Sequence, residues 1–269
     1  YRKRICIMAV LLAGSLMLGG CGVKKEKEAD SELPKIVIGM DYFEPYSYQA
    51  SDGEYKGIDV ELAKEAFRRL GYRPKFENIV WEDKDELLAD GTVDCLWSSY
   101  SMNGREDKYQ WAGPYLYSRQ MVVVKNESEI QTLSDLKGKR IAVQATTKAE
   151  DLFLHNIKSD LPQMQQVNCF STTNEIYAAL RKSYVDAIAG HEAMLGSLVK
   201  EGKDAYRMLD ESIYKSELGV AFKKGTHEEV AADLTETLKK LQREGITEKI
   251  VTKYGLDADE ILPEGEQNE

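Results

Sequence analysis

One stretch of the chain, Val93 to Glu106, combines residue types that suit a small carboxylate. It opens with apolar residues that alternate with polar ones, the pattern of a buried strand. Its end carries hydroxyl, amide and guanidinium groups, on Ser98, Ser99, Ser101, Asn103 and Arg105. Hydroxyls, free backbone N–H groups and an arginine fork leaving one strand end can hold a carboxylate. A strand followed by a polar turn with a solvated Arg105 has the same composition, so other parts of the chain must decide.

The elements around this stretch alternate between strand and helix. The first half reads as strands at 35–40, 75–79 and 93–97, with helices at 57–70 and 83–89. A second alternation places strands at 140–144, 167–170 and 185–189, with helices at 147–159, 174–182 and 192–200. This alternation of strands and helices predicts an α/β fold with mostly parallel sheets flanked by helices. Apolar runs at 120–125 and 218–222 could cross between two lobes, and helices at 227–243 and 247–254 close the chain.

The N-terminus has the form of an export signal. Three basic residues, Arg2, Lys3 and Arg4, precede a short apolar run, which ends in small residues before Cys21. This ending resembles the bacterial lipobox, which implies cleavage before Cys21 and lipidation of its thiol. We therefore expect a signal peptide at 1–20, a charged flexible linker at 21–33 and attachment to the outer face of the cell membrane through lipid. A plain signal peptide or an anchor helix is the competing interpretation.

Composition excludes several partners. Loss of the three basic residues in the signal changes the net charge from −10 to −13. So acidic a chain lacks the basic face that nucleic acid requires. No Cys/His cluster has metal-ligand spacing, and no glycine-rich phosphate loop is present, so we expect neither a metal nor a cofactor. Cys95 and Cys169 lie in strand-like runs and are predicted to be buried, unpaired thiols.

Four motifs in order resemble the polar-amino-acid solute-binding proteins of ABC importers (solute-binding protein family 3). They are the signature Gly57-Ile58-Asp59-Val60-Glu61-Leu62, the loop from Asp41 to Tyr46, the segment from Leu136 to Thr147, and Val185-Asp186-Ala187-Ile188-Ala189. The likeness extends over nearly all of residues 34–254. It implies a periplasmic-binding-protein fold of two lobes joined by two crossing strands, with an amino acid held between them. Lobe 1 would comprise 34–120 and 217–257, lobe 2 would comprise 121–216, and 258–269 would be a frayed acidic tail.

The same resemblance implies the ligand contacts. Arg105 matches the arginine that binds the ligand α-carboxylate, and Ser99 and Ser101 match neighbouring contacts. Thr146 and Thr147 match groups of the second lobe that donate to the same carboxylate at a helix start. Trp81 would form one wall of the pocket. Asp41 would be a further pocket contact.

Two positions depart from the family pattern and leave alternatives open. The loop after Asp41 is one residue short, so either Tyr42 or Phe43 could stack on the ligand. Where the family commonly has an aspartate for the ligand ammonium, this chain has His191, followed by Glu192. Because neutral histidine is a poorer partner for an ammonium, either Glu192 replaces it, Asp41 contributes, or the ligand is not a simple α-amino acid.

The resemblance implies a monomeric binding protein, not an enzyme, which delivers an amino acid to an ABC permease driven by its ATPase. Two other functions stay open. Some relatives of this fold are dehydratases of cyclic carboxylates, and His191 or Glu192 could act as a general acid or base. A ligand-sensing receptor module is the third interpretation. The residues do not say which amino acid is bound.

Overall fold

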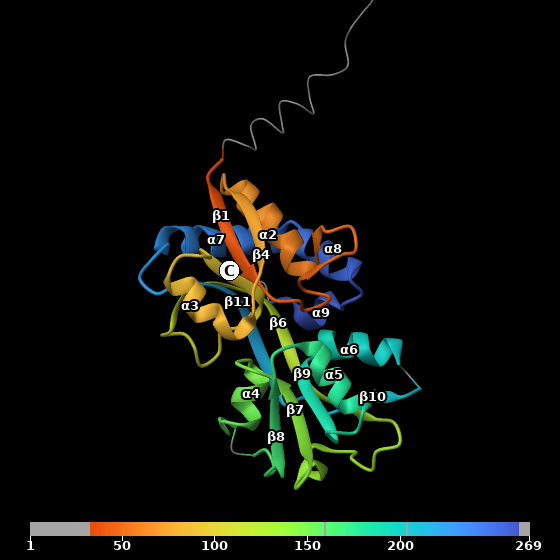
Figure 1. Ribbon diagram of the computed structural model, residues 1–269. Coiled ribbons are helices and arrows are strands. Elements are labelled where there is room, and N and C mark those ends of the chain that lie inside the picture. Colours follow the sequence, from red (N-terminus) through yellow and green to blue (C-terminus); the bar gives the residue numbers. More distant parts are fainter. Residues whose placement is uncertain (1–32, 159, 203, 264–269) are drawn as a thin grey trace, which may run out of the picture. The chain divides into compact units, whose positions relative to one another are not determined.

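The computed structural model describes residues 33–158, 160–202 and 204–263. The predicted signal peptide, the lipidation site at Cys21 and nearly all of the predicted linker lie outside these residues. Within the described part, the strands form a nine-stranded sheet in the order β4-β1-β5-β11-β6-β9-β7-β8, with β10 paired to β6 (Figure 1). A separate hairpin joins β2 (Tyr48–Gln49) and β3 (Tyr55–Lys56).

The first lobe is built on three parallel strands. These are β1 (Lys35–Met40), β4 (Arg73–Asn78) and β5 (Cys95–Ser101). In the middle of the three, Ile38 of β1 pairs with Phe76 on one side and Cys95 on the other. Strand β5 continues four residues beyond the predicted end at Trp97, so the serines that follow belong to the strand itself.

Helix α2 (Ile58–Arg69) packs an apolar face against this sheet, as its periodicity predicts. Acidic residues occupy its first turn and arginines its last, which matches the helix dipole. Gly57, the residue before it, has a φ of 122°, and a Cβ there would collide with the carbonyl of Tyr46. The family glycine is therefore required by backbone geometry. Shorter elements follow: η1 (Trp81–Asp83) and α3 (Lys84–Ala89).

Two long antiparallel strands connect the lobes. They are β6 (Tyr109–Lys125) and β11 (Tyr214–Lys223), paired from Tyr109↔Lys223 to Gln120↔Tyr214. At its far end, β6 leaves β11 and pairs with a strand of the second lobe through Gln120↔His191. The sequence predicted only residues 120–125 as a strand here, and it missed the long polar and aromatic run that precedes them.

The second lobe repeats the parallel arrangement. Its strands are β7 (Arg140–Gln144), β8 (Gln166–Phe170) and β9 (Ala187–His191), with β10 (Tyr206–Met208) at the edge. Its helical segments are η2 (Leu133–Leu136), α4 (Lys148–Phe153), α5 (Thr173–Arg181) and α6 (Glu192–Glu201). Helix α4 is six residues long, shorter than the predicted 147–159.

The chain returns to the first lobe through α7 (Glu228–Arg243) and α8 (Ile246–Lys253), and α7 lies against α2. The prediction that the chain frays from residue 258 is wrong at its start. Residues Ala258–Ile261 form a short helix, α9, whose apolar side chains pack on the core.

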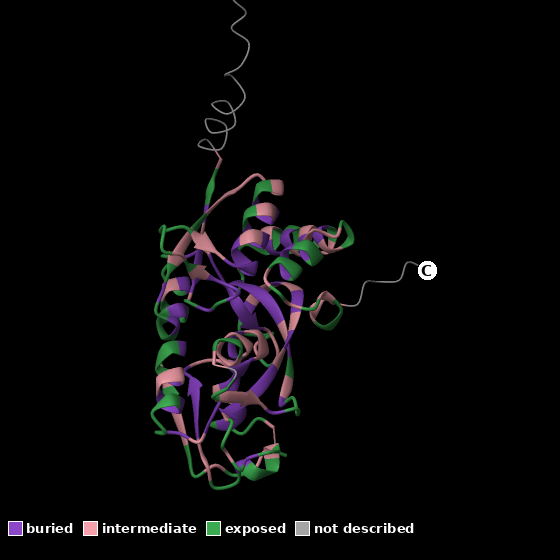
Figure 2. Ribbon diagram, turned by 90° about the vertical axis from the view of Figure 1, so that its right-hand side faces the viewer, coloured by how far each residue is buried: buried purple, intermediate pink, exposed green. Residues whose placement is uncertain are grey.

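Burial follows the layers (Figure 2). The central strands, such as β5 and β9, are buried throughout, the edge strands β4 and β8 are only partly buried, and the helices expose their polar sides. Trp97 is fully buried among Phe67 and Tyr115, which makes it a core residue. Cys95 is a buried free thiol as predicted, but Cys169 is exposed, because β8 ends the sheet and its side chains have no neighbouring strand to cover them. No described helix is both long and apolar enough to span a bilayer.

Candidate ligand-binding site

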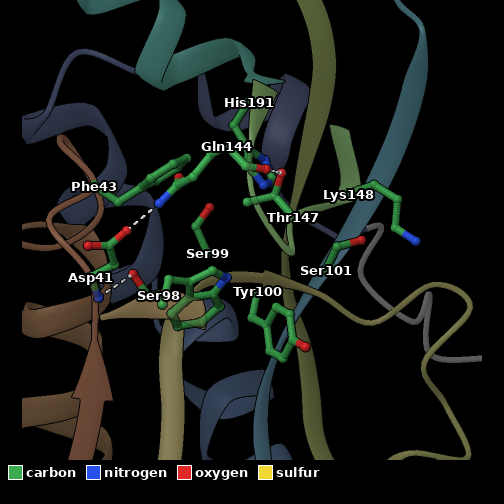
Figure 3. Close-up of a pocket in the computed structure, with 11 residues that line it drawn as sticks. Asp41, Phe43, Ser98, Ser99, Tyr100, Ser101, Gln144, Thr147, Lys148 and His191 are labelled. Carbon is green, nitrogen blue, oxygen red and sulfur yellow. Dashed lines mark hydrogen bonds between the residues drawn. The ribbon is translucent and has the colours of Figure 1, made fainter. Parts of the chain in front are cut away.

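A cavity of about 330 Å³, part of it open to solvent, lies where the two lobes meet (Figure 3). That figure includes open solvent, and the room left for water inside the cavity is about 20 Å³, so in this arrangement the lobes stand close together around it. The first lobe contributes Asp41, Phe43, Trp81, Ser98, Ser99, Tyr100 and Ser101. The second lobe contributes Gln144, Thr147, Lys148 and His191. Most of these residues lie at or just beyond strand ends, as binding sites of α/β sheets commonly do.

The structure brings together most of the side chains predicted from the sequence. Seven of them line the cavity: Asp41, Phe43, Trp81, Ser99, Ser101, Thr147 and His191. The other four, Tyr42, Arg105, Thr146 and Glu192, do not line it. Of the two aromatic alternatives, Phe43 therefore faces the cavity. Tyr42 is 42% exposed and lies beside Glu44 on the outside.

Ser99, near the end of β5, is held in place by the signature aspartate. The carboxylate of Asp59 is fully buried and accepts hydrogen bonds from the Ser99 backbone N–H at 2.6 Å and from the Tyr115 hydroxyl at 2.8 Å. Burial raises the pKa of Asp59 to about 7, although both hydrogen bonds act to lower it. The bond to Ser99 stabilises a left-handed backbone, with φ of 52°, that serine rarely adopts.

That backbone turn directs the Ser99 side chain into the cavity. Figure 3 shows its hydroxyl pointing into the space bounded by Gln144 and Thr147. The Ser99 Oγ atom is buried, and it has no hydrogen-bond partner among the described residues. A buried hydroxyl without a protein partner is unusual in a native structure, so this one is available to a ligand.

Arg105 lies beside the cavity, behind two of its lining residues. Its guanidinium stacks on the Tyr100 ring, 5.1 Å from the ring centre, and donates to the backbone carbonyl of Ser101 at 3.1 Å. It also donates to Asp151 of the second lobe at 2.6 Å. Two hydrogen bonds leave other donors of the guanidinium available, because the group carries five N–H bonds.

Lys148 is the one lysine or arginine among the described residues that line the cavity, and it was not predicted as a contact from the sequence. Its ammonium crosses between the lobes, donating to the Asn103 carbonyl at 2.7 Å and to Asp151 at 3.2 Å. Burial lowers the pKa of Lys148, with Arg105 adding to the effect. Its position directly after Thr147, in the motif that resembles the entry to the second lobe, was the available signal.

The opposite side of the cavity carries a carboxylate. Asp41 accepts a hydrogen bond from the Gln144 amide across the lobe boundary, and burial raises the pKa of this aspartate (Figure 3). Gln144 also donates to the Ser171 carbonyl at 3.1 Å. Among the described residues that line the cavity, Asp41 is the only acidic one. Gln144 belongs to the second-lobe motif, but the resemblance did not predict it as a contact.

The two threonines before α4 are used differently from the prediction. The Thr146 backbone N–H is bound by the Glu150 carboxylate from one turn further along, and the Thr146 hydroxyl accepts a hydrogen bond from Lys84 at 2.8 Å. The Thr147 hydroxyl donates to the Gln144 carbonyl at 2.7 Å. The N–H of Thr146 is therefore occupied by an acid of its own helix, and Thr147 is the threonine that reaches the cavity.

His191 lies in the cavity wall as a neutral imidazole. It is 5% exposed, and burial lowers its pKa to about 3, with Arg105 contributing a further repulsion. Its Nδ1 atom lies 2.9 Å from the Ser118 hydroxyl, and its ring meets the Phe43 ring edge to face at 5.5 Å. A neutral ring held in this way offers no charge to an ammonium.

The expectation that Glu192 replaces His191 as the partner of the ligand ammonium does not agree with the structure. Both carboxylate oxygens of Glu192 bind the guanidinium of Arg119, whose Nε donates at 2.7 Å. Glu192 lines a different cavity, which it shares with Ser118 of β6 and with C-terminal residues such as Tyr254 and Ile261. Helix α6 starts at Glu192, so its side chain leaves the strand direction that carries His191 into the site.

Asp186 has a structural role, since its carboxylate forms an ion pair with Arg140 at the other end of β7 and β9. No group of three or more His, Cys, Asp or Glu residues in the described part is arranged to hold a metal ion.

These features define a two-lobed solute-binding protein with a cavity between its lobes. The chain belongs to the bacterial extracellular solute-binding proteins, family 3, whose family model matches residues 36–257. The predicted family and the predicted two-lobed α/β fold class are thereby confirmed.

Two curated relatives have similar length. The L-cystine-binding protein TcyJ of Escherichia coli (strain K12) is 25% identical over 252 residues, which is 92% of each chain. The L-cystine-binding protein TcyA of Bacillus subtilis (strain 168) is 25% identical over 278 residues, covering 94% of this chain and 97% of its own.

Solved structures share the fold. A substrate-binding protein of an amino acid ABC transporter is 27% identical with a TM-score of 0.73, covering 82% of this chain and 98% of its own. An ancestral amino acid-binding protein described as a precursor of cyclohexadienyl dehydratase has a TM-score of 0.72, covering 86% of this chain and 98% of its own. Its identity of 23% supports the fold only.

Proposed function

We propose that this protein captures an amino acid between its two lobes outside the cytoplasm and delivers it to the permease of an ABC transporter. The observation that carries the proposal is the cavity at the lobe boundary, with the buried, unpartnered hydroxyl of Ser99 in its wall. Cations border one side of this cavity and a carboxylate lies on the other, which is the charge pattern of a zwitterionic ligand.

The ligand carboxylate would bind on the side of Arg105 and Lys148. Arg105 shares Asp151 with Lys148, so two cations are neutralised there by one direct carboxylate partner. An entering carboxylate can use the free donors of Arg105 or displace Asp151 from it. The hydroxyls of Ser99 and Ser101 lie on the first-lobe wall to complete the contact.

The ligand amino group would bind Asp41. His191 is neutral and Glu192 is committed to Arg119, which leaves Asp41 as the acid of the cavity wall. Ligand binding would then replace the Gln144 amide as the hydrogen-bond partner of Asp41, and a positive charge beside it would hold its carboxylate ionised. Phe43 and Trp81 would enclose the apolar part of the ligand.

Delivery would depend on lobe closure. A ligand with micromolar affinity supplies about 8 kcal/mol in total, and closure draws only on the part that differs between open and closed forms. The first lobe would bind the ligand first. Thr147 and Lys148 of the second lobe, which line the cavity, would supply the contacts that exist only after closure.

The expected lipid on Cys21 would tether the domain to the membrane, since the acidic chain has no electrostatic attraction to anionic lipid. The proposal includes a monomeric protein that works with a permease and its ATPase. The two cystine-binding relatives make L-cystine one of the first compounds to test.

A thermal-shift screen of the twenty amino acids, L-cystine and cyclic carboxylates tests the function, because a ligand that binds the native state raises its melting temperature. We expect a shift with at least one amino acid and one-to-one binding in calorimetry. A shift only with a cyclic carboxylate, followed by turnover of that compound, would replace the transport function with the dehydratase alternative.

A further inference from the structure

A buried lysine of the first lobe, Lys84, lies directly behind the cavity. It is 2% exposed and begins helix α3. Its ammonium lies 5.3 Å from the ring centre of Trp81 and 6.0 Å from that of Tyr100, both of which line the cavity. None of the functional roles described above uses this residue.

The hydrogen bonds of Lys84 link the two lobes. The ammonium donates to the Thr146 hydroxyl of the second lobe at 2.8 Å and to the Trp81 carbonyl of its own lobe at 3.3 Å. Thr146 covers Lys84 only while the lobes are in the arrangement that the structure shows, which we call closed. Gln144 to Asp41, Lys148 to Asn103 and Arg105 to Asp151 are further contacts of this closed arrangement.

Both partners of Lys84 are neutral. Within the described residues, no carboxylate lies within ion-pair distance of its ammonium, whereas Arg105 and Lys148 each pair with Asp151. A buried cation that lacks a counter-ion is costly, since water no longer solvates it. In the closed arrangement Lys84 is therefore a buried cation without a direct counter-ion.

The groups that face Lys84 come from every neighbouring element. They are Asp85 on α3, Tyr100 on β5, Arg105 and Lys108 in the loop after β5, and Glu150 on α4. Asp85 is itself paired with Lys108 and Tyr109, and Glu150 binds the Thr146 N–H. Burial outweighs the attraction of these acids and lowers the pKa of Lys84 to about 8.

We propose that Lys84 is a positioning residue that opposes lobe closure until an anionic group enters the cavity. The proposal rests on the proposed function, because it explains how a binding protein would avoid closing empty. In the open form Thr146 moves away and water solvates the ammonium. In the closed form a carboxylate near Trp81 and Ser101 supplies the missing negative charge, so closure selects for an anionic ligand.

Closure without ligand gives a direct test. Dyes at Glu86→Cys and Tyr184→Cys, one exposed site on each lobe, report the interlobe distance by single-molecule energy transfer. The full chain is used, with Cys6, Cys21 and Cys169 replaced by serine. We expect Lys84→Met to raise the ratio of closed to open molecules at pH 7 by tenfold or more, because burial of the charge is removed. Lys35→Met, at the exposed start of β1 in the same lobe, leaves the ratio unchanged, and Lys84→Arg keeps it low.

A pH titration supplies a second measurement, which is made first on the chain with Lys84 present. Since the pKa of Lys84 is about 8 when closed and near 10.5 in solvent, raising the pH above 8 favours the closed form. The ratio should rise about tenfold per pH unit for each such lysine. Lys148 also contributes to the pH dependence of the ratio of closed to open molecules. Lys84→Met should therefore lower the slope of that dependence by the equivalent of one proton.

The anionic part of the proposal is tested with acetate. Sodium acetate at 0.2 M should raise the closed fraction relative to sodium chloride when Lys84 is present, and it should do so less in Lys84→Met. An unchanged or lower closed fraction in Lys84→Met would show that Lys84 fastens the lobes together, and would overturn the proposal. An acetate effect equal in both proteins would overturn the anion dependence. Neither result depends on whether an amino acid is the ligand.

Discussion

Replacing Ser99 separates two effects that the structure combines at one residue. Its backbone has a φ of 52°, which costs roughly 1–2 kcal/mol for a residue with a Cβ. Its buried hydroxyl without a partner adds roughly 1–3 kcal/mol of desolvation. Ser99→Gly removes both costs, but the greater conformational freedom of glycine in the unfolded chain lowers the free energy of unfolding again by about 0.5–1 kcal/mol. We expect a net gain in the free energy of unfolding of about 2 kcal/mol.

Ser99→Ala is the matched control, because it removes the hydroxyl and keeps the left-handed strain. In differential scanning calorimetry the glycine variant should melt about 4–8 °C above the parent chain, with the alanine variant between them. Both variants should lose about 2- to 12-fold in ligand affinity, the value of one hydrogen bond. A glycine variant less stable than the parent would refute the strain argument. Unchanged affinity in both variants would refute the assignment of the hydroxyl as a ligand contact.

Three further predictions concern buried titratable groups and the Glu192 correction. The pKa of Asp59 is raised to about 7 by folding, so its contribution to stability is greatest below pH 4 and is lost as the pH rises to 7. The pKa of His191 is lowered to about 3, so its contribution is lost as the pH falls below 6.5. Between pH 4 and 6.5 each group changes the free energy of unfolding by roughly 1.4 kcal/mol per pH unit, and the two changes have opposite signs. In urea unfolding, His191→Gln should therefore become more stable as the pH falls, and Asp59→Asn should become less stable. Parallel slopes in the two variants would contradict both assignments. Glu192→Gln should change the ligand affinity measured by calorimetry by no more than about threefold, because the Glu192 carboxylate binds Arg119 outside the cavity. A tenfold loss of affinity would instead show that Glu192 contacts the ligand.

The strand–helix rhythm and the family motifs were sufficient to predict the fold because each lobe repeats a simple parallel arrangement. The long strand β6 escaped prediction, since Tyr109 to Arg119 pairs with β11 through backbone bonds and lacks the alternation of apolar residues. Likewise, α4 ends early at Phe153, where nothing in the local sequence marks a stop.

The site was predictable where a motif supplied it and not where tertiary contacts decide. Tyr42 and Phe43 are adjacent, and the sequence does not distinguish which of the two rings faces the cavity. The bridge between Phe43 and Ser47 turns the chain so that Phe43 is buried and Tyr42 is exposed. The pairing of Glu192 with Arg119 joins residues 73 positions apart, so no local pattern could reveal it. Lys84 and Lys148 had the pattern of solvated surface lysines, and their burial depends on the opposite lobe.

The central claim is that Arg105 anchors a ligand carboxylate at the lobe boundary. Calorimetric titration of Arg105→Ala with the amino acid that gives the largest thermal shift tests it, with Arg140→Ala as a control that removes an arginine paired elsewhere. Two charge-assisted hydrogen bonds contribute roughly 3–6 kcal/mol, so we expect affinity to fall by about 10² to 10⁴ in Arg105→Ala and to stay unchanged in Arg140→Ala. Equal affinity of Arg105→Ala and the parent chain would contradict the carboxylate site.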